Sequence, residues 1–372
     1  MTTVSERISQ SAFDGSRLRV VLLLDLHEGA QQRFLEAYEY LRSQVASVPG
    51  HLTDQLCQSI ENPSQWLITS EWESAPPFLA WVNSEEHVKM VQPLHSCVRN
   101  TRSLRFSVLR ETSSAATAAP EPSKGRLQSE PRVGDGVVRH ALTFTVKPGS
   151  ESMVAEILAG YDSPQARVDD TTRLRRTSLF MHGNRVVRAV EVQGDLVAAL
   201  RHVSEQPEVR AVEEAINPYL EQDRDLTDPN SARVFFTRAA LPAVHHVAAG
   251  QELRDDLRHA LYYPAKEGCG MALARMLARQ DELAADDPDS PIDASTIFQR
   301  DDIVVRLIDL RVPLDDTEPD LVIGVHGPRK RGVFKRLMDT DAAGGLTTDR
   351  ELAHFLARSD MDLITDRRAP DS

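Results

Sequence analysis

The first clear pattern in the chain is an apolar run of strand length that ends at Gly29 and gives way to apolar residues at helical spacing. Short apolar runs indicate strands, whereas apolar positions at i, i+3 and i+4 indicate an amphipathic helix. The elements predicted in this way are a strand over residues 18–26, a helix over 30–48, strands around 54–60 and 65–72, a helix over 76–91 and a strand over 103–109. Their order, β-α-β-β-α-β, is the ferredoxin-like pattern, an antiparallel sheet with both helices on one face.

The opening of this pattern recurs twice more along the chain. Each copy is an arginine that opens an apolar strand, then a glycine turn, then a helix, from Arg19 to Gly29, from Arg139 to Gly149 and from Arg258 to Gly268. The opening arginines are 120 and then 119 residues apart, so one supersecondary unit occurs three times. We therefore predict an α+β protein of three tandem ferredoxin-like units.

The second and third copies differ in how far they follow the first. The second is predicted to contain a strand over residues 138–146, a helix over 151–161, strands near 177–181 and 185–192, a helix over 196–212 and a strand over 233–238. The third agrees through its first four elements, including a helix near 272–280 and a strand over 303–310. Breaks at 327–331 and 342–348 then interrupt the pattern, so we expect a divergent third unit.

Changes in composition set the predicted boundaries. Residues 111–136 are rich in Ser, Ala, Pro and Gly and lack apolar periodicity, which is typical of a linker. The predicted parts are a polar tail over residues 1–17, a first unit over 18–110, the linker over 111–136, a second unit over 137–250 and the divergent third unit over 251–372. No comparable linker divides the last two units, so we expect them to form one compact body.

The overall composition is that of a soluble globular protein, with 41% hydrophobic and 27% charged residues. A net charge of -13 and a pI of about 5.4 oppose unselective binding to nucleic acid or to an anionic membrane, because such binding needs a basic face. Three widely spaced cysteines indicate neither a disulfide framework nor a cysteine-based zinc site. The polar N-terminus and the lack of an apolar run of about 20 residues predict a cytoplasmic protein.

A histidine begins the same apolar face in the second and third units. Strand alternation puts His140 on one face with Leu142 and Phe144, and it puts His259 on one face with Tyr263. The first unit has Val20 at this place. An unpaired buried polar group costs about 1–3 kcal/mol, so each histidine needs a partner. Two interpretations stay open: a hydrogen-bonded core histidine, or a general base.

An arginine occupies the same position in the central hairpin strand of the second and third units. Arg188 and Arg306 align when the two strands are superposed, and both share a face with aliphatic residues. A guanidinium keeps its proton, so in a cavity it pairs with a carboxylate or binds an anion such as a phenolate or enolate. The structural alternatives are an edge-strand arginine in water, or an ion pair with Glu191 or Asp309 of a neighbouring unit.

The first unit carries tryptophans where the other two carry these polar groups. Trp66, Trp72 and Trp81 can form the wall of a flat aromatic site, or they can fill the core, which is the commoner use of tryptophan. The sequence contains no glycine-rich nucleotide loop and no histidine-carboxylate metal triad. We therefore expect neither a metal nor a flavin or nicotinamide cofactor.

Short motifs connect the units to two families. The first unit, with Val48-Pro49-Gly50-His51 and Ser70-Glu71-Trp72-Glu73-Ser74, resembles the antibiotic biosynthesis monooxygenase domain. The other two resemble the SchA/CurD-like domain of aromatic polyketide and spore-pigment gene clusters, through Arg139-His140-Ala141-Leu142, Pro242-Ala243-Val244-His245-His246 and Arg258-His259-Ala260-Leu261. The first resemblance implies oxidation of a phenol or anthrone without metal or flavin, in which a substrate enolate reduces oxygen directly.

The chain departs from the first family at one position of that site. Trp72 matches the family tryptophan, but Ile68 stands where the resemblance implies an asparagine, and isoleucine cannot hydrogen-bond an enolate. We therefore place the catalytic residues in the last two units, with an arginine stabilising a phenolate and a histidine with a pKa near 6.5 removing the proton. The predicted catalytic residues are His140, Arg188, His259 and Arg306, and the predicted substrate-binding residues are Trp66, Trp72, Trp81, Phe144 and Tyr263.

The expected function is that of a cofactor-independent monooxygenase acting on a polycyclic aromatic polyketide, with molecular oxygen as co-substrate. Two alternatives stay open, a polyketide cyclase or aromatase and a non-catalytic partner subunit of a tailoring oxygenase, because a cyclase needs the same base and enolate-binding group. Ferredoxin-like units pair sheet to sheet, so an odd number of units predicts a homodimer.

Overall fold

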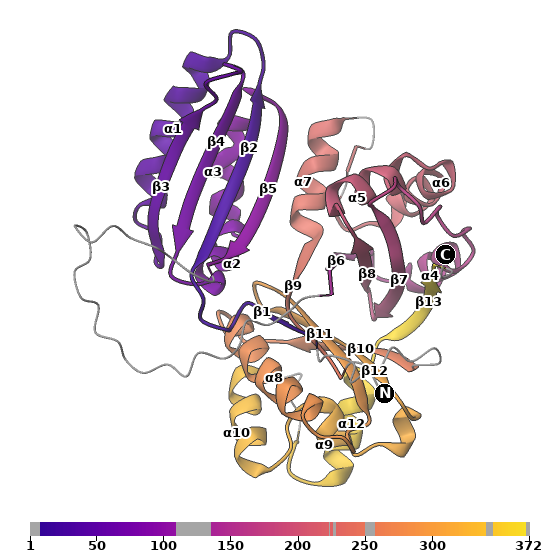
Figure 1. Cartoon of the computed structure of the whole chain (residues 1–372). Helices are drawn as coiled ribbons and strands as arrows, with labels where there is room; N and C mark the ends of the chain where they lie inside the picture. The colour runs from indigo at the N-terminus through magenta and orange to yellow at the C-terminus, as the bar shows by residue number, and fades with distance from the viewer. Residues whose placement is uncertain are drawn as a thin grey trace, which may run out of the picture. The chain divides into compact units, whose positions relative to one another are not determined.

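The computed structural model describes residues 8–108, 135–222, 224–225, 228–249, 257–339 and 345–369 (Figure 1). The chain divides into two compact units. The N-terminal unit is Ala12–Arg132, and the C-terminal body combines Met1–Ser11 with Val133–Ser372. Most of the predicted linker lies outside the described residues. Within the described residues, no helix is long and apolar enough to cross a membrane.

The N-terminal unit has the predicted ferredoxin-like order. Its elements are β2 (Leu18–Leu26), α1 (Gln31–Val45), β3 (His51–Gln58), β4 (Gln65–Trp72), α2 (Ala75–Val82), α3 (Glu85–His95) and β5 (Val98–Ser107). The four strands are antiparallel in the order β3-β4-β2-β5. The second predicted helix is divided in two, because Ser84 caps α3 by accepting a hydrogen bond from the His87 N–H at 3.1 Å.

The C-terminal body contains two series of elements. The first is β6 (Val137–Thr145), α4 (Glu151–Ala159), β7 (Arg173–His182), β8 (Arg185–Gln193), α5 (Leu196–Glu205), α6 (Pro207–Ile216), η1 (Asn217–Tyr219), α7 (Pro229–Ala239) and β9 (Ala240–Ala248). The second is β10 (Leu257–Pro264), α8 (Gly270–Ala285), β11 (Ile292–Arg300), β12 (Ile303–Leu310), η2 (Leu314–Asp316), α9 (Pro319–Ile323), α10 (Pro328–Leu337), α12 (Asp349–Ser359) and β13 (Asp362–Arg368).

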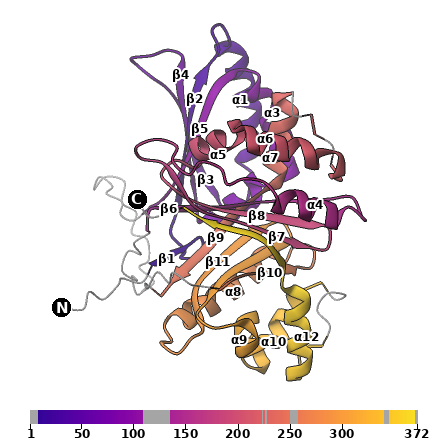
Figure 2. The ribbon, with the colours of Figure 1, turned by 90° about the vertical axis from the view of Figure 1, so that its right-hand side faces the viewer.

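The strands of the C-terminal body belong to one antiparallel sheet, in the order β10-β12-β11-β9-β6-β8-β7-β13, and β1 (Ile8–Ser11) pairs with β9 beside this path. The fourth strand of each series pairs with the second strand of the other, β9 with β11 and β13 with β7. The two outer strands also meet, since the Met361 N–H donates to the Ala260 carbonyl at 2.9 Å. The sheet is therefore nearly closed, and the helices of the two series cover it on opposite sides (Figure 2).

Side chains that point into this nearly closed sheet form its own core, and they come from both series. The buried members are Ala141, Phe180, Val187, Ala189, Leu241, Ala260, Phe298, Val305, Leu307 and Met361. A second core lies between the sheet and the helices of the first series, around Leu158, Leu179 and Ile216. The last two predicted units thus share one sheet and one interior instead of forming two separate sheets.

Two sequence predictions are wrong. Residues 8–11 of the predicted polar tail form the strand β1 (Ile8–Ser11). It pairs with residues 245–248 of β9, whereas β6 pairs with residues 240–242 of the same strand. The predicted strand over residues 233–238 lies inside the helix α7, and the strand β9 follows it directly. Phe235 and Ala239, one helical turn apart, are both buried against the helix-side core, and this tertiary packing overrides the strand preference of the local sequence.

Candidate functional site

Strands β6 and β8 bring two of the predicted catalytic residues onto one face. His140 lies opposite Val190 and Arg188 lies opposite Leu142, so the histidine and the arginine occupy diagonal positions of neighbouring strands. Leu142 packs into the core under the helices, and this face is therefore the helix-facing one. His140 is half-buried there.

Strands β10 and β12 repeat this register. His259 lies opposite Ile308, and Arg306 lies opposite Leu261. In the N-terminal unit the two equivalent positions are apolar. Val20, opposite Ser70, stands in place of the histidine, and Ile68, opposite Leu22, stands in place of the arginine. The two histidine-arginine pairs are therefore equivalent in position, and their surroundings decide what each pair can do.

Arg188 belongs to a buried group with an excess of positive charge. Its Nη1 donates to the Glu213 carboxylate on α6 at 2.9 Å, and the other Glu213 oxygen accepts from Arg224 Nη2 at 2.6 Å. Although burial opposes it, the two guanidinium groups hold the pKa of Glu213 below its usual range. Among the described residues, the ion pairs of this group join two cations and one carboxylate, which leaves one positive charge. Within the described residues, the buried Nε of Arg188 has no hydrogen-bond partner.

Arg306 belongs to a neutral and closed pair. Its Nε donates to Asp281 on α8 at 2.9 Å, and a second guanidinium nitrogen donates to the Val322 carbonyl. The side chains of Arg306 and Asp281 are 1% and 0% exposed. A Cβ on Gly324 would lie only 3.6 Å from Arg306 Nη1, so the backbone also closes over the guanidinium. This arginine has the contacts of a structural ion pair.

The other candidates of the C-terminal body have separate environments. His259 Nδ1 lies 3.3 Å from the Asp360 carboxylate, and both side chains are about a quarter exposed. Tyr263 is fully buried, donates to the Ile323 carbonyl at 3.2 Å, and has a pKa raised by burial. Phe144 packs against Phe235 with ring centroids 6.1 Å apart. Tyr263 and Phe144 therefore lie in the core.

Two of the three tryptophans lie together. Trp72, which is fully buried, stacks on Trp81 with centroids 5.3 Å apart, and its Nε1 donates to Ser70 Oγ at 3.0 Å. The buried Trp81 Nε1 has no hydrogen-bond partner within the described residues. Trp66, at the other end of β4, donates to the Pro63 carbonyl at 3.1 Å. Trp66 is therefore not part of the Trp72–Trp81 stack.

Sequence reasoning missed a polar chain beside Trp72. The His51 ring meets Trp72 edge to face at 5.2 Å, His51 Nε2 lies 3.7 Å from Asp54, and the Tyr38 hydroxyl donates to Asp54. On the far side of the stack, burial lowers the pKa of His87 to about 4, so this ring is neutral at physiological pH. His51 directly follows a Pro-Gly pair, and this was the only signal in the sequence.

An ion network inside the sheet was also missed. Arg258 donates to Asp309 at 2.7 Å and lies 2.8 Å from Glu191 of the other series, while Arg176 pairs with Asp366 at 2.6 Å. Despite burial, Arg258 and Arg176 hold the pKa of Asp309 below its usual range. Glu191 and Asp309, considered as partners for Arg188 and Arg306, thus bind the arginine that opens the third repeat.

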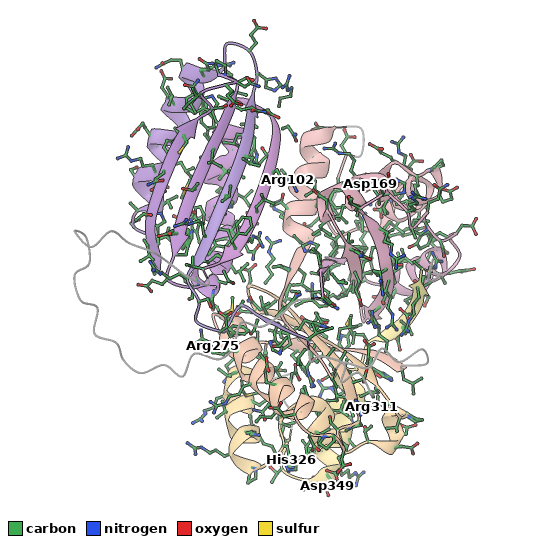
Figure 3. The ribbon with its side chains drawn as sticks, in the orientation of Figure 1. Arg102, Asp169, Arg275, Arg311, His326 and Asp349 are labelled. Atoms are coloured by element: carbon green, nitrogen blue, oxygen red, sulfur yellow. The ribbon has the colours of Figure 1, made fainter. Side chains whose placement is uncertain are left out.

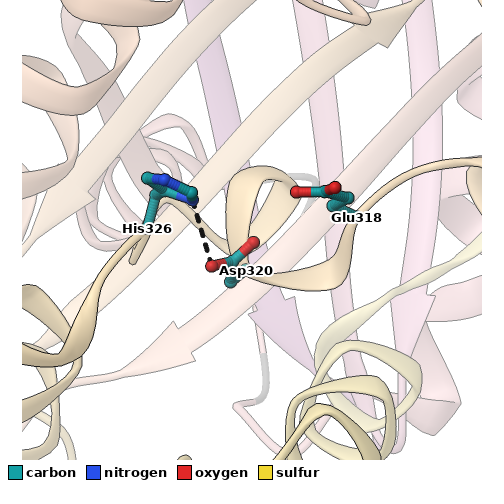
Figure 4. A group of neighbouring side chains, drawn as sticks. All are labelled: Glu318, Asp320 and His326. Carbon is teal, nitrogen blue, oxygen red and sulfur yellow. Dashed lines mark hydrogen bonds and ion pairs between the residues drawn. The ribbon is translucent and has the colours of Figure 1, made fainter.

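One group of side chains has the composition of a metal site. Donor atoms of Glu318, Asp320 and His326 lie within 4.8 Å of one another (Figure 4). His326 is 67% exposed at the surface of the C-terminal body (Figure 3). Asp320 also accepts from Arg331 Nη2 at 3.0 Å. The Arg331 guanidinium already pairs with the central carboxylate, Asp320, so the group has the features of a surface ion cluster.

Two family models match the chain. The antibiotic biosynthesis monooxygenase model matches residues 17–93, and the SchA/CurD-like domain model matches residues 137–249. The protein "Polyketide synthase CurD" of Streptomyces cyaneus is 65% identical over 99% of both chains. The chain belongs to the SchA/CurD family. "Protein SchA" of Streptomyces halstedii is 59% identical over 100% of this chain and 98% of its own.

Both family resemblances expected from the sequence are thus confirmed for this SchA/CurD protein. The SchA/CurD-like match covers the first series of the C-terminal body, and the second series lies beyond the matched residues. Among solved structures, SnoaB, a cofactor-independent oxygenase from Streptomyces nogalater, is 16% identical over 28% of this chain and 99% of its own, with a TM-score of 0.25. A protein of Bordetella bronchiseptica that is named after the antibiotic biosynthesis monooxygenases is 14% identical over 25% of this chain and 96% of its own, with a TM-score of 0.24.

Proposed function

We propose that this SchA/CurD protein is a cofactor-independent monooxygenase that oxidises an aromatic polyketide phenol, giving a hydroxylated or quinone product. The antibiotic biosynthesis monooxygenase match over residues 17–93 supports the reaction type. The name of the CurD relative supports the substrate class. Molecular oxygen is the co-substrate, and the proposed mechanism uses no metal or flavin.

The excess positive charge at Arg188 is the observation that carries the site assignment. An aromatic phenol loses a proton before its enolate can react with oxygen, and the resulting anion needs a compensating charge in a buried site. Arg188, Glu213 and Arg224 provide one unbalanced positive charge on the helix-facing side of the sheet. We assign the proton transfer to His140, which lies diagonal to Arg188.

The reaction balances without a cofactor when the substrate supplies all four electrons that reduce oxygen. His140 removes a proton from an acidic ring position, and Arg188 stabilises the resulting enolate. The enolate carbon forms a bond to oxygen and gives a peroxide, which is protonated. When that carbon was a CH2 group in the substrate, it keeps one hydrogen in the peroxide. Loss of water then leaves a carbonyl, so one oxygen atom enters the quinone and the other leaves as water.

The remaining predicted site residues are less suited to this step. Arg306 is neutralised by Asp281 and closed off from solvent. In the N-terminal unit Ile68 offers no hydrogen bond, and Trp72 is fully buried with its N–H on Ser70. We therefore assign the chemistry to His140 and Arg188, and we assign Arg306 to the fold.

Oxygen uptake with an anthrone-like phenol, in buffer treated with chelator and free of flavin, tests the proposal. Arg188→Gln should lower kcat about 10²–10³-fold, as expected for loss of one group that stabilises an oxyanion. Glu213 keeps Arg224 as a partner in this variant, so the core should still fold. Arg210→Gln, at an exposed position of α6, is the matched control and should leave the rate unchanged.

The results separate the reaction from the site. No oxygen uptake by the wild-type protein with several phenols would refute the monooxygenase, and a cyclised product without uptake would indicate a cyclase. Full activity of Arg188→Gln and of His140→Ala would refute the site while leaving the reaction in place.

We also propose a homodimer formed through the N-terminal sheet. The two series of the C-terminal body close on each other within one chain, whereas Leu23 and Phe106, on the sheet face away from the N-terminal helices, are 40% and 51% exposed. A second copy would cover these side chains. Sedimentation should show a dimer that Phe106→Lys converts to a monomer; a wild-type monomer at working concentration would refute the proposal.

A further inference from the structure

A cavity of about 300 Å³ lies in the C-terminal body, where the end of β7 from the first series and the end of β10 from the second meet α12. It is lined by His182, Tyr262, Pro264, Met338, Phe355, Arg358 and Ser359. Met338, Phe355 and Ser359 are buried, whereas Arg358 is exposed. The cavity therefore has a buried apolar floor and a charged rim, which is the arrangement of a small-molecule site.

This cavity is separate from the His140–Arg188 site. Tyr262 belongs to the inner side of the sheet, where it packs against the shared core, and Arg188 belongs to the helix-facing side. None of the lining residues takes part in the Arg188 ion group. A ligand in the cavity would thus leave the proposed reaction site open.

The aromatic and cationic groups of the cavity favour a flat anionic ligand. The Arg185 guanidinium lies 5.4 Å from the Tyr262 ring centroid, and the His182 ring lies 5.3 Å from it. Arg185 is not a lining residue, so Arg358 provides the guanidinium at the rim, and the lining, all of it within the described residues, contains no carboxylate. Apolar walls with cations and no competing acid suit an aromatic ring that carries an acidic oxygen.

The hydrogen-bonding groups fit the same ligand. His182 Nε2 lies 2.6 Å from the Arg358 carbonyl oxygen, which can only accept, so Nε2 carries the proton. In the neutral ring, Nδ1 is then an acceptor available to a phenol. Within the described residues, the hydroxyls of Tyr262 and Ser359 have no hydrogen-bond partner. Both are available as donors to a phenolate or carboxylate.

We propose that this cavity is a second ligand site, which binds a fused aromatic molecule of two or three rings that carries a phenolate or carboxylate oxygen. The size follows from the volume of about 300 Å³, which is at the lower end of the range for small-molecule sites. Arg358 binds the anionic oxygen and Tyr262 contacts the rings. The proposal does not depend on the oxygenase reaction.

Fluorescence titration with 1-hydroxy-2-naphthoate tests it on the full chain. Arg358→Gln should weaken binding about tenfold, which corresponds to loss of one charge-assisted contact. Arg350→Gln removes the same charge from an exposed position of the same helix and should bind like the wild type. The neutral 1-methoxynaphthalene should bind more weakly, with equal affinity for wild type and Arg358→Gln.

Two further variants keep the test decisive. Tyr262→Leu, checked for folding by circular dichroism, should weaken both probes, because both use the ring contact. Arg188→Gln should bind the naphthoate normally. Equal affinities of Arg358→Gln and Arg350→Gln, or loss of binding in Arg188→Gln alone, would overturn the proposal. Naphthoate binding by a protein that shows no oxygen uptake with several anthrone-like phenols would support this site while refuting the proposed reaction.

Discussion

The buried Asp281–Arg306 pair is expected to be a main support of the C-terminal body. Asp281 accepts from Arg306 Nε at 2.9 Å and from Ser295 Oγ at 2.7 Å, and both charged side chains are 1% exposed or less. Asp281→Asn keeps the shape but leaves a guanidinium buried without its carboxylate, which costs about 3–5 kcal/mol. At about 2–4 °C per kcal/mol, the melting transition of the body should fall by about 6–20 °C.

Differential scanning calorimetry measures this effect. Asp170→Asn is the control, because Asp170 pairs with Arg167 at positions that are 92% and 78% exposed, and surface pairs contribute little. The double variant Asp281→Leu/Arg306→Met should be more stable than Asp281→Leu alone, since removing both charges leaves no unpaired cation. A transition that moves by less than about 2 °C in Asp281→Asn would refute the reasoning from buried charge.

Three further predictions concern stability. Burial lowers the pKa of His246 from 6.5 to about 3, so the unfolded chain binds an extra proton between these two pH values. The stability of the body should therefore decrease as pH falls through that window, and it should decrease less steeply in His246→Asn. Equal slopes of melting temperature against pH in the two proteins would contradict this. Deletion of residues 1–11 removes β1, which pairs with β9. It should speed amide hydrogen exchange in β9 and lower the melting temperature of the body. Unchanged exchange would show that β1 does not stabilise β9. Gly194→Ala should destabilise the body far more than Gly183→Ala. Both glycines have a positive φ, but a Cβ on Gly194 would lie 2.5 Å from the Thr171 carbonyl oxygen, whereas a Cβ on Gly183 would face open space. Equal melting temperatures of the two variants would contradict this.

Strands were the most predictable elements. The strands over residues 18–26, 65–72 and 303–310 were predicted with the bounds that the structure shows, because each is an apolar run between turn residues. Helices were less well bounded. The second helix of each of the first two units is divided, at Ser84 and at Pro207, since a capping serine and a first-turn proline each begin a new helix.

The positions of the site residues could be predicted, but their ionic partners could not. Strand alternation and the repeat were enough to place His140 with Arg188 and His259 with Arg306. The carboxylates come from different helices, Glu213 from α6 and Asp281 from the long first helix α8. Nothing in the spacing along the chain shows which helix approaches which arginine, because tertiary packing decides it. The charge that distinguishes the two sites therefore required the structure.

The arginine that opens each repeat has the same register in all three. It lies directly across from an acidic residue on the central hairpin strand, Arg19 from Glu71, Arg139 from Glu191 and Arg258 from Asp309. In the N-terminal sheet this pair is on the surface, where Arg19 is 52% exposed and the ion pair contributes little to stability.

In the C-terminal body the same register turns the arginine and its acid to the inside. There Arg258 is 5% exposed and also reaches Glu191 of the other series. Arg139 pairs with Asp135 of its own series at 2.6 Å, whereas Glu191 and Asp309 both bind Arg258. Buried charges must be paired, so loss of either acid would leave positive charge inside the sheet. Of the opening arginines, Arg258 therefore connects the two series, because it pairs with Asp309 on the neighbouring strand of its own series and with Glu191 of the first series.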